Sequence, residues 1–100
     1  MDFDKAFDAI VDAMKRAAAK ADRSIASKEA ERQGLVEIGA GQSVNPVVWE
    51  KTDGGRTIRF RWRWYDPSQV FSIRPDINVL TAEIISAGGI ERQAEERFED

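Results

Sequence analysis

The feature that most constrains the fold is a run of strict alternation between apolar and polar side chains at residues 56–65. Because successive side chains of a β-strand point to opposite faces of a sheet, this period of two predicts a strand with one apolar and one polar face. The apolar members are Ile58, Phe60, Trp62 and Trp64. The polar members that follow them in turn are Arg59, Arg61, Arg63 and Tyr65.

A β-hairpin is predicted at the start of this strand. Asp53-Gly54 is a favoured two-residue turn because both residues tolerate a positive φ, and it sets Trp49 opposite Ile58. The alternative turn at residues 54–55 sets Lys51 opposite Ile58, which mixes charged and apolar side chains. We therefore predict the first register.

A second turn is predicted at the end of the strand, in residues 66–69, where proline occupies a favoured turn position. A four-residue loop there sets Phe71 opposite Trp64. The same register sets Ile73 opposite Trp62, and Arg74 across the pair from Arg61. Residues 35–38 are a candidate for a short edge strand, so residues 35–74 are predicted to form an antiparallel sheet of three or four strands.

An amphipathic helix is predicted at the N-terminus, because apolar residues recur there at alternating spacings of four and three. They are Phe3, Phe7, Ile10, Met14, Ala17 and Ala21. A helix over residues 3–33 would be about 46 Å long at ~1.5 Å per residue, and a compact chain of this length is roughly 34 Å across. The helix must therefore break, most plausibly at residues 22–24, or project from the body.

The C-terminal segment is harder to assign. Residues 77–87 fit either a helix or a strand, and we predict a helix because Asp76 can cap it and Gly88-Gly89 can end it. Residues 90–98 are predicted to form a short acidic helix. The predicted fold is thus α+β in a single domain, residues 1–100: helical at 1–33, sheet at 35–74, and a C-terminal segment at 76–100 that is predicted to be helical.

The composition argues against an enzyme. The chain has no histidine and no cysteine, so it lacks the commonest general base, the thiolate nucleophile and the usual zinc ligands. Asp4, Asp8 and Asp12 share one helix edge and are a candidate for Mg²⁺, although a solvated helix flank is the preferred interpretation. We predict no catalytic residue, no metal, no cofactor and no small-molecule substrate.

Two further features bear on the cellular location. No apolar run approaches the ~20 residues that a membrane-spanning helix needs, and the acidic start, Met1-Asp2-Phe3-Asp4, differs from the basic start of a signal peptide. The absence of cysteine fits a reducing compartment. We expect a cytoplasmic protein with no membrane partner.

The candidate binding residues are the polar members of the sheet, Arg59, Arg61, Arg63, Tyr65 and Arg74. Clustered arginines require a counter-anion nearby. Three sources are open: the phosphates of a nucleic acid with Tyr65 stacking on a base, an acidic patch on a partner protein, or the acidic residues 91–100 of this chain. The further alternative is a face that is simply solvated. The net charge of −3 favours a protein partner over a nucleic acid.

The opening sequence Asp2-Phe3-Asp4-Lys5-Ala6-Phe7-Asp8-Ala9-Ile10 resembles the start of phage head–tail attachment proteins. The resemblance covers residues 2–10. It implies a small protein without catalytic activity that assembles as a ring between the filled head and the tail, in the cytoplasm of a bacterial host or in the virion.

The predicted function is therefore that of a non-enzymatic assembly protein, most concretely a head–tail connector component that oligomerises. Its arginines would pair with acidic surface on a neighbouring subunit, for which the acidic tail is a candidate. The alternative is a small binding or inhibitory protein that docks a nucleic acid, or a partner that processes nucleic acid, through the same arginines.

Overall fold

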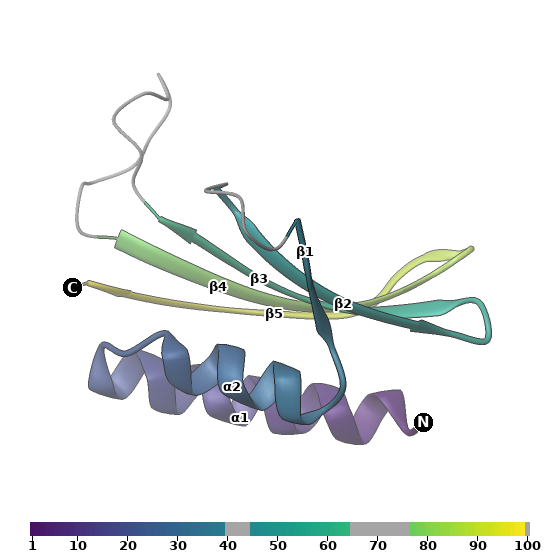
Figure 1. Cartoon of the computed structure of the whole chain (residues 1–100), viewed down its shortest axis with the longest axis horizontal. Helices are drawn as coiled ribbons and strands as arrows, with labels where there is room; N and C mark the ends of the chain where they lie inside the picture. Colours follow the sequence, from purple (N-terminus) through teal and green to yellow (C-terminus); the bar gives the residue numbers. More distant parts are fainter. Residues whose placement is uncertain (40–44, 65–76, 100) are drawn as a thin grey trace.

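The computed structural model describes residues 1–39, 45–64 and 77–99, which form two layers (Figure 1). The elements are α1 (Phe3–Lys20), α2 (Ser24–Arg32), β1 (Val36–Ile38), β2 (Val47–Asp53), β3 (Arg56–Trp64), β4 (Ile77–Ser86) and β5 (Gly89–Glu99). The strands form one antiparallel sheet in the order β1-β2-β3-β4-β5, and both helices lie on one of its faces. The α+β prediction is confirmed, with five strands in place of three or four.

The N-terminal helical region breaks where the sequence predicts it. Asp2 caps α1 by accepting a hydrogen bond from the backbone N–H of Lys5, and Ala21 ends α1 in the left-handed conformation with a φ of 50°. The Asp22 carboxylate then accepts hydrogen bonds from the backbone and the hydroxyl of Ser24, which lower the pKa of Asp22. This junction folds α2 back beside α1, so that neither helix projects.

The core lies between the helices and the sheet. The predicted stripe of α1 is buried as far as Ala17, whereas Ala21 is exposed at the junction. Trp62 is half-buried at the margin of the core, where the Arg23 guanidinium lies 3.8 Å from its ring centroid. The side chains that the sheet buries in this core include Trp49, Ile58, Phe60, Leu80 and Ile84.

The predicted register of the first hairpin is wrong. Gly54 and Gly55 form the turn with φ of 59° and 79°, which sets Lys51 opposite Ile58. Positive φ at both turn positions is easiest for glycine. The two registers differ by two residues in total, so both leave every side chain on the same face, and the apolar alternation does not distinguish them.

The register of the next strand pair also differs from the prediction. Trp64 pairs with Asn78, Trp62 with Leu80 and Arg61 with Thr81. The predicted pairings of these β3 residues with Phe71, Ile73 and Arg74 are therefore wrong, because β4 occupies that place. The predicted turn at residues 66–69 lies outside the described residues.

The predicted C-terminal helices are wrong as well, because residues 77–86 and 89–99 form the β4–β5 hairpin. Strand β4 lies inside the sheet, between β3 and β5, and is buried from Asn78 to Ile84 on both faces, so it lacks the alternation typical of a half-exposed strand. In β5 the four-residue spacing of Ala94 and Phe98 satisfies a strand as well as a helix, since four is also a multiple of two. No helix among the described residues is long and apolar enough to cross a membrane.

Candidate functional site

The candidate site is the sheet face that points away from the helices, which we call the open face. No described element covers it (Figure 1). Cross-strand partners share a face, so the pairing places the three arginines of β3 on the open face together with polar residues of its neighbours. Its members are Val36, Ile38, Val48, Glu50, Arg59, Arg61, Arg63, Val79, Thr81, Glu83, Gln93, Glu95 and Arg97.

Arg59 is held by its neighbour across the β2–β3 pair. Its Nη2 lies 2.7 Å from Oε2 of Glu50, and its Nε donates a hydrogen bond to the same oxygen at 2.8 Å. The two residues are directly opposite each other in the sheet. The Arg59 charge is therefore balanced within the chain.

Arg61 supplies the counter-charge of a buried acid. Its Nη2 lies 2.7 Å from Oε1 of Glu83, an ion pair without hydrogen-bond alignment. Glu83 is only 4% exposed. Burial of an unpaired carboxylate costs several kcal/mol, so Arg61 is required for the fold and is not free for a partner.

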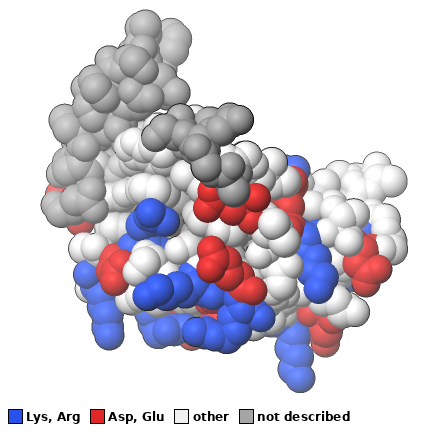
Figure 2. Space-filling model, viewed as in Figure 1, with Lys and Arg blue, Asp and Glu red and all other residues white. Residues whose placement is uncertain are grey.

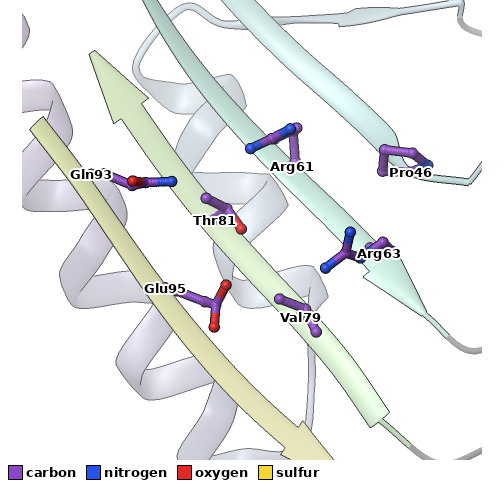
Figure 3. Close-up of a pocket in the computed structure, with 7 residues that line it drawn as sticks. All are labelled: Pro46, Arg61, Arg63, Val79, Thr81, Gln93 and Glu95. Atoms are coloured by element: carbon purple, nitrogen blue, oxygen red, sulfur yellow. The ribbon is translucent and has the colours of Figure 1, made fainter. Parts of the chain in front are cut away.

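Arg63 is the exposed arginine of the three. Among the described residues it has no ion-pair partner. Arg61 and Arg63 border a hollow of about 100 Å³ on the open face, which is smaller than the ~300 Å³ of a typical small-molecule site. Figure 3 shows the hollow between β3 and β5, with the helices behind the sheet; its other lining residues are Pro46, Val79, Thr81, Gln93 and Glu95.

The remaining predicted site residues, Tyr65 and Arg74, lie outside the described residues. The acids that balance Arg59 and Arg61 also differ from the expected ones, because they come from β2 and β4 and not from the C-terminal tail. Glu50 could have been found from the sequence, since it lies on the polar side of its strand. Glu83 could not, because its segment fitted a helix as well as a strand.

Two acids of the C-terminal segment, Glu91 and Glu95, bind arginines other than Arg59 and Arg61. The Arg56 guanidinium donates two hydrogen bonds of 3.1 Å to the Glu91 carboxylate, which lower the pKa of Glu91. Glu95 accepts a 2.9 Å hydrogen bond from Arg97 on its own strand. Of these contacts, only the one between Glu95 and Arg97 lies on the open face.

The aspartates on the edge of α1, Asp4, Asp8 and Asp12, form ion pairs with arginines. Arg92 of β5 donates hydrogen bonds to Asp8 at 2.9 Å and to Asp4 at 3.2 Å, which raise the pKa of Arg92. Asp12 accepts one from Arg16. Within the part of the chain that the structure describes, no three acidic side chains gather in the way a metal site requires.

The surface combines mixed charge with exposed apolar groups at the sheet margin. Acidic and basic side chains are interspersed over the helical layer at the bottom of Figure 2. On the open face, Val36 and Ile38 of β1 are 70% and 52% exposed. Among the described residues, the open face thus combines exposed aliphatic groups, paired charges and one arginine without an ion-pair partner.

Three comparisons with known proteins found no match, whether to a protein-family model, to a curated protein or to a solved structure.

Proposed function

We propose that this chain is a non-enzymatic assembly or interaction protein that binds a protein surface through its open face. One observation carries the proposal: no described element covers a complete face of the sheet, although that face contains aliphatic side chains. Exposed aliphatic groups and balanced charges suit a protein partner, which can bury the former and match the latter.

The charge on this face favours a protein over a nucleic acid. A phosphate backbone is bound by arginines that are free to replace its counterions. Arg59 and Arg61 are already paired with Glu50 and Glu83, so phosphate contacts would have to displace a carboxylate, in one case a buried one. Arg63 alone among the three supports the alternative of docking a nucleic acid.

The concrete form of the proposal is a phage head–tail connector component, and it rests on the resemblance of residues 2–10. In the structure those residues have folding roles. Asp2 caps α1, Phe3 and Phe7 are buried, and Asp8 binds Arg92. These folding roles explain the residues without a connector function. Support for the connector form must therefore come from evidence that the chain assembles.

The test is the solution mass by light scattering on a sizing column, over a range of protein concentrations, for the wild type and for Arg63→Glu. Lys28→Glu is the matched control, because it makes the same charge change at an exposed position of α2. We expect the wild type to form oligomers, Arg63→Glu to weaken them and Lys28→Glu to leave them unchanged. Equal oligomers in all three would show that the open face is not the contact.

Arg61→Glu is unsuitable for this purpose, because it would place a second carboxylate beside the buried Glu83. The nucleic-acid alternative is tested with a labelled oligonucleotide at low salt. Binding that falls steeply with added salt would support it, and absence of binding would reject direct docking.

A further inference from the structure

Strand β5 is a long edge strand of the sheet. It has 11 residues, whereas β1 at the opposite edge has three, and β4 is its one strand partner among the described elements. Every second residue of an edge strand directs its backbone N–H and C=O away from the sheet, so β5 offers a row of unpaired groups to another strand.

The side chains of β5 match those of a second β5 in one antiparallel register. A two-fold axis perpendicular to the sheet at Ala94 pairs Ala94 with its own copy. It places Arg92 opposite Glu96 of the second copy, and the symmetry repeats this pair. Opposite charges directly across an antiparallel pair are stabilising. Both positions are on the helix-covered face, since Arg92 pairs with Ile84 and Glu96 with Leu80.

Neighbouring registers lack this match. An axis at Arg92, Glu95, Glu96 or Arg97 places two like charges against each other at the axis itself. An axis at Gln93 places Glu91 opposite Glu95. The register centred on Ala94 is thus the one, among residues 92–97, that sets no like charges directly opposite. Like charges in that position are destabilising, so among these six registers the charges of β5 favour the one centred on Ala94.

Glu96 has the properties this register requires. It is half-buried, and no hydrogen bond or ion pair to it is found among the described residues. Arg92 already binds Asp4 through Nη1 and Asp8 through Nη2. A guanidinium has five N–H donors, so Arg92 retains donors for another carboxylate.

A groove beside β5 leaves room for the second copy. It has a volume of about 450 Å³ and lies between α1 and β5. Phe7, Val11 and Ala94 form its apolar part, and its charged residues are two acids and two bases: Asp8, Asp12, Lys15 and Arg92. Because α1 and β5 run in the same direction (Figure 1), the two-fold axis sets the two α1 helices antiparallel and directs Lys15 of one copy towards Asp8 of the other.

From this match of charge, register and space we infer that β5 pairs with β5 of a second copy of this chain, about a two-fold axis at Ala94. The pairing joins the two sheets into one, with all helices on the same side and the two open faces side by side. It deepens the proposed assembly function and rests on it, because it names the first contact of the assembly. A two-fold contact closes at two subunits, so a ring would also need the open face.

The test uses single cysteines, because the chain has none of its own. The variants are Gln93→Cys, Ala94→Cys, Glu95→Cys and Glu96→Cys, oxidised gently and resolved on a non-reducing gel. Cβ atoms directly opposite in an antiparallel pair are about 4.5–5.5 Å apart, within the reach of a disulfide. We expect Ala94→Cys to form a linked dimer and the other three to form at least about 10-fold less.

A non-covalent measurement supplements the cysteine scan. Glu96→Arg should raise the dimer dissociation constant by roughly 10-fold in sedimentation equilibrium, because two attractive pairs become repulsive. Glu37→Arg is the matched control, since Glu37 is also half-buried but lies on β1, at the other edge. Cross-linking that is equal at all four positions, or greatest away from residue 94, would overturn the inference.

The outcomes separate this inference from the proposed function. If Ala94→Cys does not cross-link but Arg63→Glu still dissociates larger oligomers, the β5 contact is wrong and the open-face function stands. If Ala94→Cys cross-links and Arg63→Glu changes nothing, the dimer stands and self-association through the open face is rejected. A wild type that stays monomeric, with no cross-linking, rejects both the β5 contact and self-association through the open face.

Discussion

Glu83 is almost fully buried on a sheet face that no described element covers, with Arg61 as its counter-charge. It lies on β4, between Arg59 of β3 and Gln93 of β5. An acid at such a position is tolerated only if its charge is paired. At the scale of single residues, two of the three arginines of β3 therefore neutralise acids of the sheet itself.

This pairing predicts a large cost for removing Arg61. Arg61→Ala leaves an unpaired carboxylate in the sheet, and we expect the free energy of unfolding in urea to fall by about 3 kcal/mol. The double variant Arg61→Met with Glu83→Leu removes both charges and should recover most of that loss. A loss below about 1 kcal/mol in Arg61→Ala would be that of an exposed pair, and would contradict the structural role.

The ion pair between Arg56 and Glu91 predicts a dependence on pH. The hydrogen bonds from Arg56 lower the pKa of Glu91 from its ordinary value of 4.5. A carboxyl with a lowered pKa stabilises the folded state above the pKa of the unfolded chain, and the effect is lost as the pH falls through the folded pKa.

We therefore expect Glu91→Gln to be less stable than the wild type at neutral pH, and the difference to shrink as the pH falls below 4.5. Urea unfolding at a series of pH values measures it. Added salt should reduce the difference at neutral pH, because the pair is exposed. A difference that stays constant with pH would mean that the charge of Glu91 contributes nothing.

At the scale of elements, the break between α1 and α2 depends on one strained residue. Ala21 adopts a φ of 50°, in the left-handed region that disfavours residues with a Cβ atom. Its backbone N–H still caps α1, because it lies within hydrogen-bond reach of the carbonyls of Ala17 and Ala18. Glycine is the usual residue at such a helix end.

Ala21→Gly should accordingly stabilise the protein by about 0.5–1 kcal/mol, because glycine adopts this conformation without strain. The matched control is Ala19→Gly, two residues earlier and also exposed. It should destabilise by about 1 kcal/mol, since glycine is unfavourable inside a helix. Urea midpoints measure both, and effects of the same sign would contradict the assigned conformation of Ala21.

At the scale of the whole molecule, β5 is both an edge strand of the sheet and a part of the core. Helix α1 packs across β3, β4 and β5, and Phe98 near the end of β5 is buried. Removal of β5 would expose one edge of β4, which is buried on both faces from Asn78 to Ile84. The C-terminal segment is therefore an integral part of the fold.

Deletion of residues 89–100 should abolish the cooperative unfolding transition that circular dichroism follows during urea titration. A separate helical tail, as predicted from the sequence, would leave that transition in place. Phe98→Ala is a milder test of the same packing, with an expected loss of about 3 kcal/mol from the cavity it creates. A truncated chain that still unfolds cooperatively would contradict the observed role of β5.

The sequence by itself determined the local features. The alternation of β3 required a two-faced strand, and the stripe of α1 required a helix with one buried side. The length of the helical region required either a break or a projecting helix, and the structure shows the break, at residues 21–23. The lack of histidine and cysteine excluded the chemistries that depend on them. Each of these follows from neighbours in the chain.

Tertiary structure alone decided what depends on distant partners. The two possible registers of the first hairpin put the same side chains on the same faces, so only the backbone geometry of Gly54-Gly55 separates them. The segments 77–86 and 89–99 become strands because they complete the sheet. Glu83 becomes a buried acid only once β4 lies beside Arg61. These features depend on pairing between segments that are remote in the sequence. The periodicity of one segment does not specify which other segment it pairs with.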